Sequence, residues 1–268
     1  MTREAVIVAG SRTAVGKSKR GTTRNWRSDE MAAAVIQDLL KKAPALDPAE
    51  IDDVIIGCAM PEGAQGLNFA RTIALRAGLP VNTPGQTVNR FCSSGLQTIA
   101  MAAERIIANG ADVIIAGGAE TMSLVPMTGY RVNPNPYVVD NMPEVYMGMG
   151  LTAERVADEY EVTRQAQDEF AVRSHQKAAA AYERQAFKDE IVPLEIEEVV
   201  AGPNGPQRTT SIFDRDEHMR PETSLRVLRV MTAVFFLAHA IVRICNGTIP
   251  RFADFMEAHG FPHGMLWV

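Results

Sequence analysis

Cysteine is scarce in this sequence, and its spacing offers no cross-link. Only Cys58, Cys92 and Cys245 occur, far apart and without any paired Cys or Cys/His spacing. This pattern disfavours a disulfide framework and a structural zinc site. We therefore expect no metal and a reducing, intracellular setting.

An excess of positive charge is also missing. The 32 Asp and Glu residues outnumber the 27 Lys and Arg residues, which gives a net charge of −5, and both signs are spread along the chain. No basic stripe is available to follow a phosphate backbone, so nucleic acid is not an expected partner. The apolar run Ala5–Val8 is too short for the core of a signal peptide, and we expect the main body to be cytoplasmic.

Short apolar runs alternate with segments of helical periodicity up to residue 122. β-Branched runs of this kind are typical of strands covered on both faces. The alternation predicts an α/β domain in which helices pack on a mostly parallel or mixed sheet. We expect strands at Ala5–Val8, Asp52–Gly57, Thr87–Arg90 and Asp112–Gly118, and helices at Ser28–Lys42, Asn68–Ala77 and Ser94–Asn109.

The character of the chain changes after Thr121-Met122. Residues 123–222 begin with a stretch rich in Pro and Asn, followed by two expected helices, Thr152–Tyr160 and Arg164–Arg184. A strand pair or an extended segment at Glu190–Val200 and a turn at Pro203–Pro206 come after them. Such an excursion from a layered core usually covers a substrate. We expect three parts: an α/β domain (1–122), a lid (123–222) and a helical tail (223–268).

Cys92 is the candidate nucleophile, because it lies between an expected strand and an expected helix start. Ser94-Gly-Leu-Gln97 matches a capping box that opens this helix. A helix N-terminus stabilises a thiolate over a thiol, and afterwards an oxyanion beside the sulfur. The alternative is a buried apolar cysteine that only packs at the strand–helix junction.

Cys92 lies in the stretch Asn89-Arg-Phe-Cys-Ser-Ser-Gly-Leu-Gln97. This stretch resembles the nucleophile motif of the thiolase family, and the resemblance covers residues 1 to about 225 in order. Further matching stretches are Val6–Gly16, Ala116–Ser123, Met147–Glu154, Gln167–His175 and Arg220–Ser224. The resemblance implies a thiolase-like layered α/β/α half with an inserted lid. A dinucleotide-binding domain is a weaker alternative, because Ala116-Gly-Gly-Ala119 lacks the required glycine spacing and acidic residue.

The resemblance implies an acetyl-CoA C-acyltransferase that acts on fatty-acid-derived 3-ketoacyl-CoA. An acyl group would be held on Cys92 and passed to a second coenzyme A, with no cofactor beyond coenzyme A as co-substrate. Met147 would lie near the pantetheine arm and Arg220 near the nucleotide; the alternatives are lid packing and a solvated charge. His175 is expected at the surface rather than as a base. Intact family members imply a homo-oligomer, a dimer or tetramer.

The sequence departs from the family after Ser224-Leu225. The second half of a thiolase supplies a histidine base, an Asn-Glu loop and a second cysteine, and no matching motif occurs here. We therefore expect a truncated chain that is weakly active or inactive alone; the alternative is a non-catalytic remnant that acts as an interaction or membrane-tethered fragment. Leu225–Ile244 approaches the roughly 20 residues that span a bilayer and resembles the first helix of DoxX-like membrane proteins, although a buried soluble helix is an alternative.

Overall fold

The computed structural model of the chain describes residues 3–202 and 205–228. The chain divides into two compact units, one of residues 1–147 and 181–219, the other of residues 148–180 and 220–268. The predicted boundaries at 122 and 222 are not those of these units and stay predictions. Most of the predicted tail (223–268), including most of Leu225–Ile244, lies outside the described residues.

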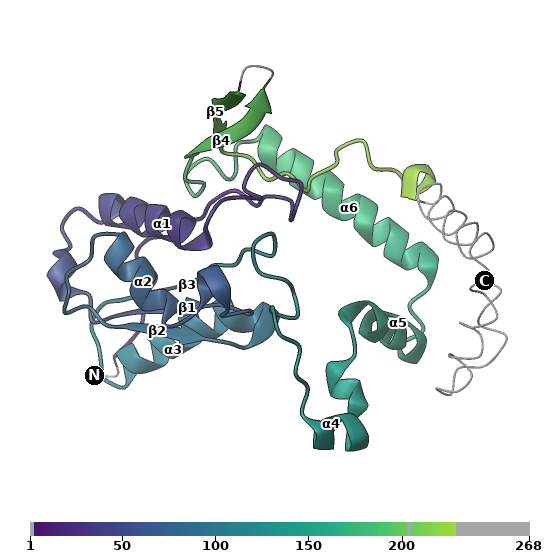
Figure 1. Cartoon of the computed structure of the whole chain (residues 1–268), viewed down its shortest axis with the longest axis horizontal. Coiled ribbons are helices and arrows are strands. Elements are labelled where there is room, and N and C mark those ends of the chain that lie inside the picture. The colour runs from purple at the N-terminus through teal and green to yellow at the C-terminus, as the bar shows by residue number, and fades with distance from the viewer. Residues whose placement is uncertain (1–2, 203–204, 229–268) are drawn as a thin grey trace. The chain divides into compact units, whose positions relative to one another are not determined.

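A parallel three-stranded sheet forms the centre of the first unit (Figure 1). Its strands are β1 (Asp53–Gly57), β2 (Gly85–Val88) and β3 (Ile114–Gly118), in the order β2-β1-β3. β1 is buried along its whole length, as the sequence predicted for a strand covered on both faces. The predicted α/β class and parallel sheet are thus confirmed.

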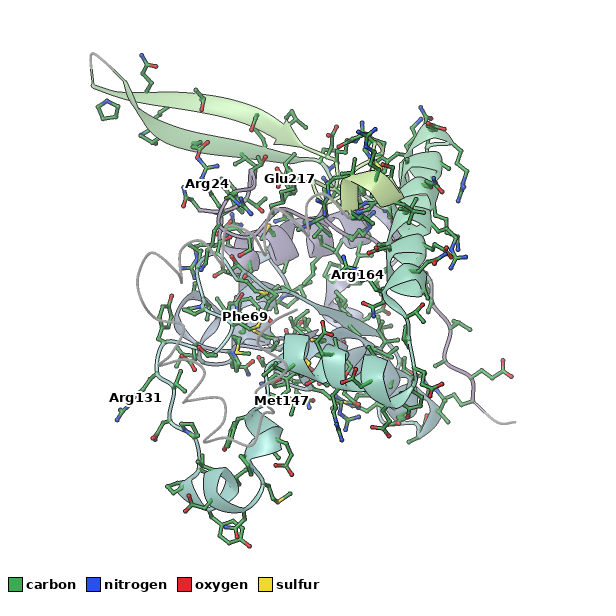
Figure 2. All side chains as sticks on the ribbon, turned by 90° about the vertical axis from the view of Figure 1, so that its right-hand side faces the viewer. Arg24, Phe69, Arg131, Met147, Arg164 and Glu217 are labelled. Atoms are coloured by element: carbon green, nitrogen blue, oxygen red, sulfur yellow. The ribbon has the colours of Figure 1, made fainter. Side chains whose placement is uncertain are left out.

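Helices cover the two faces of the sheet. Val54 and Ile56 of β1 belong to the core that includes α1 (Ser28–Lys42) and α2 (Phe69–Arg76), with Phe69 among its largest fully buried side chains (Figure 2). Successive side chains on a strand point to opposite faces, so Ile55 and Gly57 face α3 (Ser94–Ile107) instead. The predicted start of α2 is confirmed, since the Asn68 side chain accepts a hydrogen bond from the Arg71 N–H at 3.2 Å.

α3 has an unusual distribution of side chains. The buried residues on it are small or hydroxyl-bearing: Ser94, Thr98 and Ala102. Its large apolar residues Leu96, Ile99 and Ile107 are exposed. Small residues on the sheet side allow α3 to lie close to the strands.

A hairpin and several short elements complete the first unit. β4 (Leu194–Gly202) and β5 (Gly205–Phe213) pair antiparallel and pack with Ala14 and Trp26 in a second apolar core. The segment Glu190–Val200, predicted as a strand pair or an extended segment, overlaps β4 alone, and β5 follows it in the sequence. The remaining helical elements of this unit are η1 (Pro48–Glu50), η2 (Gly63–Gln65), η3 (Phe91–Ser93), α4 (Pro136–Asn141) and η4 (Pro143–Tyr146).

The predicted strand Ala5–Val8 is not a strand. Among the described residues nothing pairs with it, and Val6, Ile7 and Val8 are 73%, 84% and 82% exposed. A strand needs a neighbour to satisfy its backbone N–H and C=O groups, and an apolar run alone does not supply one.

The second unit contains α5 (Met149–Glu159) and most of α6 (Arg164–Glu183), close to the two predicted helices. Thr163 accepts a hydrogen bond from the Ala166 N–H at 3.2 Å and so caps α6. A helical turn begins at Leu225, where the Ser224 hydroxyl accepts from the Val227 N–H at 3.3 Å. No helix within residues 3–202 and 205–228 has the length and apolar character required to cross a bilayer.

Candidate active site

Cys92 lies where β2 passes into α3. β2 ends at Val88, a 3₁₀ turn spans Phe91–Ser93, and α3 begins directly at Ser94. Cys92 is exposed, whereas Cys58 is buried. The alternative of a cysteine buried for packing is therefore wrong for Cys92, and the expected position at a helix start agrees with the structure.

The turn before Cys92 has a special backbone. Phe91 has φ +46°, a left-handed conformation that costs an L-residue with a Cβ roughly 1–2 kcal/mol. Its N–H donates to Asn89 Oδ1 at 2.9 Å, and Asn89 Nδ2 donates to the Ala59 carbonyl at 3.0 Å. Both ends of the Asn89 side chain thus support the turn.

The capping box predicted at Ser94–Gln97 is wrong. The Ser94 hydroxyl accepts from the Arg90 N–H at 2.8 Å and donates to the Phe91 carbonyl at 2.6 Å, so it closes the preceding turn. The residue at the N-cap position is Ser93, whose hydroxyl donates to the Arg90 carbonyl instead of capping the helix. The 3₁₀ turn continues into α3 and displaces the cap.

Glycines bring the start of α3 against the sheet. A Cβ on Gly57 would lie 2.6 Å from the Ser94 carbonyl carbon and 2.8 Å from Gly95 N. Thr98 Oγ1 also donates to the carbonyl of Gly117 in β3 at 2.9 Å. Cys92 therefore lies on a helix start that is held against the carboxyl ends of parallel strands, the edge at which α/β sheets bind ligands.

A buried amide joins the loops at the same edge. Gln65 is fully buried, and its Nε2 donates to Met60 O at 2.9 Å, to Cys58 Sγ at 3.5 Å and to Glu120 Oε1. Its Oε1 accepts from the Ser28 hydroxyl at 3.1 Å and from the Thr121 N–H. Burial, together with the nearby Glu120 carboxylate, raises the pKa of Cys58 to about 12, so this thiol stays protonated.

Sequence reasoning missed this group. Gln65 lies 37 residues from Ser28 and 55 from Glu120, and no local pattern connects them. Glu120 did fall within a stretch that resembles thiolases, but without a role.

The two predicted coenzyme A contacts lie in different units. Met147 is partly buried and directly follows η4 in the first unit (Figure 2). Arg220 is exposed in the second unit. His175 is partly buried, and its Nδ1 accepts a hydrogen bond from the Arg220 backbone N–H at 3.2 Å. The binding roles of Met147 and Arg220 stay predictions.

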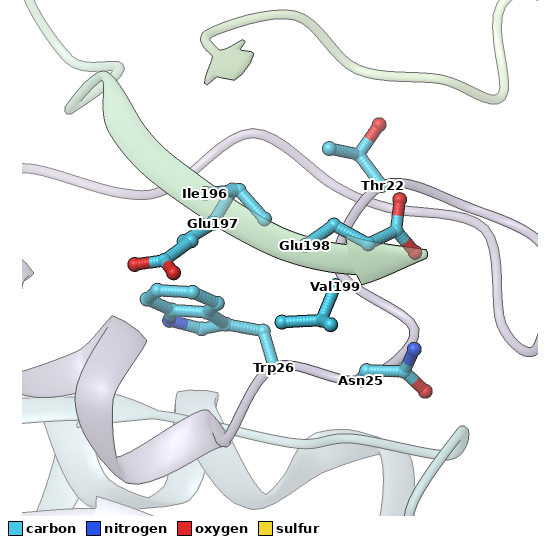
Figure 3. A pocket seen from close by; sticks show the side chains of 7 residues that line it. All are labelled: Thr22, Asn25, Trp26, Ile196, Glu197, Glu198 and Val199. Carbon is cyan, nitrogen blue, oxygen red and sulfur yellow. The ribbon is translucent and has the colours of Figure 1, made fainter. Parts of the chain in front are cut away.

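A pocket of about 230 Å³ lies elsewhere, beside the hairpin (Figure 3). None of the predicted site residues lines it. Its lining residues are Thr22, Asn25, Trp26, Ile196, Glu197, Glu198 and Val199. A second pocket of about 190 Å³ also contacts Trp26. Within the described part of the chain, no group of His, Cys, Asp or Glu side chains could hold a metal ion.

Comparison with known proteins agrees with the sequence resemblance. Residues 5–242 match the family described as "Thiolase, N-terminal domain". The chain is 50% identical to a 3-ketoacyl-CoA thiolase of Bacillus subtilis over 234 residues, covering 87% of the chain and 60% of the relative. It is 42% identical to a 3-ketoacyl-CoA thiolase of Saccharophagus degradans over 233 residues, covering 87% and 58%.

A solved structure gives the same result for the fold. The crystal structure of the Bacillus anthracis acetyl-CoA acetyltransferase superposes with a TM-score of 0.71 and 35% sequence identity, covering 85% of this chain and 58% of that chain. This chain therefore spans about three fifths of the length of its relatives. The family match extends to residue 242, beyond the junction expected near 225, and the DoxX-like tail stays a prediction.

Proposed function

The chain belongs to the thiolase family, and on that premise we propose that Cys92 is the acyl-accepting nucleophile of an acetyl-CoA C-acyltransferase. The single observation that carries the proposal is the exposed thiol at the start of α3, at the carboxyl edge of the parallel sheet. The relatives named 3-ketoacyl-CoA thiolase support a 3-ketoacyl-CoA as the acyl donor.

The proposed reaction has two acyl-transfer steps. The Cys92 thiolate attacks the 3-keto carbon, the C2–C3 bond breaks, and its electron pair stays on C2, which takes up a proton as acetyl-CoA leaves. The acyl group remains on Cys92 Sγ as a thioester. The thiolate of a second coenzyme A then attacks the thioester carbonyl, and the Cys92 thiolate is the leaving group. No oxidant or reductant is needed.

The arrangement of the chain supports the stabilisation of negative charge near Cys92. The positive end of the α3 dipole points at the turn that carries the sulfur, where both the thiolate and the tetrahedral oxyanion form. The described histidines are His175 and His218, and His175 Nδ1 already accepts a hydrogen bond. We do not assign either as the base, and we expect acylation of Cys92 to be measurable while sustained turnover by this chain alone is weak.

The remaining assignments complete the proposal. Residues 123–222 would act as a lid, Met147 would contact the pantetheine arm, and Arg220 would pair with a phosphate of coenzyme A. Coenzyme A is a co-substrate in this scheme. For assembly, the corresponding prediction is a dimer or tetramer. For location, it is the cytoplasm, with membrane association through residues 225–244.

Single-turnover acylation tests the function. The purified chain is mixed with acetoacetyl-CoA and quenched with acid, and the acyl adduct is located by peptide mass spectrometry. We expect an acetyl group on the peptide that contains Cys92, release of that group by coenzyme A, and loss of both signals in Cys92→Ala. An unmodified Cys92 peptide in a folded chain would contradict the proposal and would favour the non-catalytic remnant.

A further inference from the structure

Hydrogen bonds join all three loops that leave the carboxyl edge of the sheet. Asn89, in the loop after β2, donates from Nδ2 to the Ala59 carbonyl in the loop after β1 at 3.0 Å. The Ala59 N–H donates in turn to Glu120 Oε2 after β3 at 2.6 Å. Gln65 then binds Glu120 Oε1 from the buried side.

The chain of contacts ends at the residue before the nucleophile. Asn89 Oδ1 accepts from the Phe91 N–H at 2.9 Å, and Phe91 has the left-handed φ of +46°. A phenylalanine gains nothing from this conformation, because its Cβ is crowded there. The turn persists only where its surroundings favour it.

We propose that Asn89, Glu120 and Gln65 form a positioning network that holds the Phe91 turn and thereby fixes Cys92 at the start of α3. Gln65 is the fixed end of this network, because five partners hold it in the core: Cys58, Met60, Glu120, Ser28 and Thr121. Asn89 is the exposed end of the network, and its Oδ1 connects the network to the turn by accepting from the Phe91 N–H. The inference rests on Cys92 as the nucleophile, although its test does not require acyl transfer.

Removal of the Asn89 side chain leaves the Phe91 N–H without its side-chain acceptor, although the Ser94 hydroxyl still closes the turn. A net hydrogen bond changes an equilibrium constant by roughly a factor of two to ten, so the ratio of chains with Cys92 in place to chains with Cys92 displaced should fall by about fivefold in Asn89→Ala. In Phe91→Gly the left-handed conformation carries no steric cost, so the turn keeps most of its population without Asn89. The effect of Asn89→Ala should then shrink to less than about twofold.

Peptide-resolved labelling with iodoacetamide tests this network in the full chain. The labelling rate of Cys92 is measured in wild type, Asn89→Ala, Phe91→Gly and the double variant, with the exposed Asn25→Ala as a matched control. The buried Cys58 reports the integrity of the same edge in every sample. We expect slower Cys92 labelling in Asn89→Ala only, with Cys58 protected throughout.

Three results would overturn the positioning role. They are equal Cys92 rates in Asn89→Ala and Asn25→Ala, an undiminished effect in the Phe91→Gly background, and simultaneous exposure of Cys58. If Asn89→Ala fails to fold, Asn89→Asp replaces it, because the carboxylate still accepts from Phe91 while it cannot donate to Ala59; unchanged labelling of this variant would also count against the network. Failure of the proposed function has a different signature, namely wild-type Cys92 that labels no faster than a thiol of the unfolded chain.

Discussion

Replacement of Gly57 by alanine should separate α3 from the sheet. The new Cβ would lie 2.6 Å from the Ser94 carbonyl carbon, whereas ordinary contact begins at 3.4 Å, so the helix start must move away from β1 to restore ordinary contact. The nearest atoms are the Ser94 carbonyl carbon, Ser94 Cβ and Gly95 N, and no side-chain rotation can move any of them away. Overpacking of this kind costs about 1–3 kcal/mol.

The expected loss of about 2 kcal/mol corresponds to a fall in Tm of roughly 4–8 °C for a unit of this size. Gly117→Ala is the matched control, because a Cβ on Gly117, in the neighbouring strand β3, would meet nothing within 4 Å. Thermal melting and the Cys92 labelling rate are measured for both variants. If Gly57→Ala melts and reacts like Gly117→Ala, the claim that close approach to β1 holds the helix start is refuted.

Three further predictions concern single side chains. Because the pKa of Cys58 is raised in the folded state, its protonated thiol favours folding below about pH 9, and this contribution is lost as the pH rises towards about 12. The urea midpoint should therefore fall less over this pH range in Cys58→Ala than in wild type. Partial burial alone would raise the pKa of Asp216, but its hydrogen bonds with Arg12 lower this pKa overall. The stabilisation by ionised Asp216 is therefore present at neutral pH and lost as the pH falls below about 4. Asp216→Asn should be less stable than wild type at pH 7 by about 1–2 kcal/mol, and its urea midpoint should fall less on acidification. Arg220→Ala should raise the coenzyme A concentration for half-maximal release of the acyl group about two- to fivefold, and the exposed Arg173→Ala should leave it unchanged. An equal effect of both arginine variants would indicate general charge and not a phosphate contact.

The layered core could be predicted because its signals are local. Buried β-branched residues mark β1, and an Asn cap with helical periodicity marks α2, so both appeared within a residue or two of their observed bounds. The placement of Cys92 between a strand and a helix followed from the same local patterns.

The errors arose where the structure depends on distant partners. Val6 and its neighbours have strand composition, but pairing depends on another segment, and the described residues supply none. Ser94 begins a capping-box sequence, but the left-handed Phe91 makes a tighter turn, in which the Ser94 hydroxyl donates to the Phe91 carbonyl instead of capping the helix. The partners of Gln65 come from separate parts of the chain, and a single sequence contains no signal for such long-range contacts.

The buried Gln65, together with the hydrogen bonds of Ala59 to Asn89 and Glu120, also makes the three strand-end loops mutually dependent. Any change that releases one loop leaves the buried Gln65 amide, or a backbone group that it binds, without its partner, and that loss adds to the local cost. The three loops should consequently open as one cooperative unit and not one at a time. Their slowly exchanging amide hydrogens should then report the same free energy of opening. Evolutionary replacement at one of these positions would be tolerated chiefly when the others change with it.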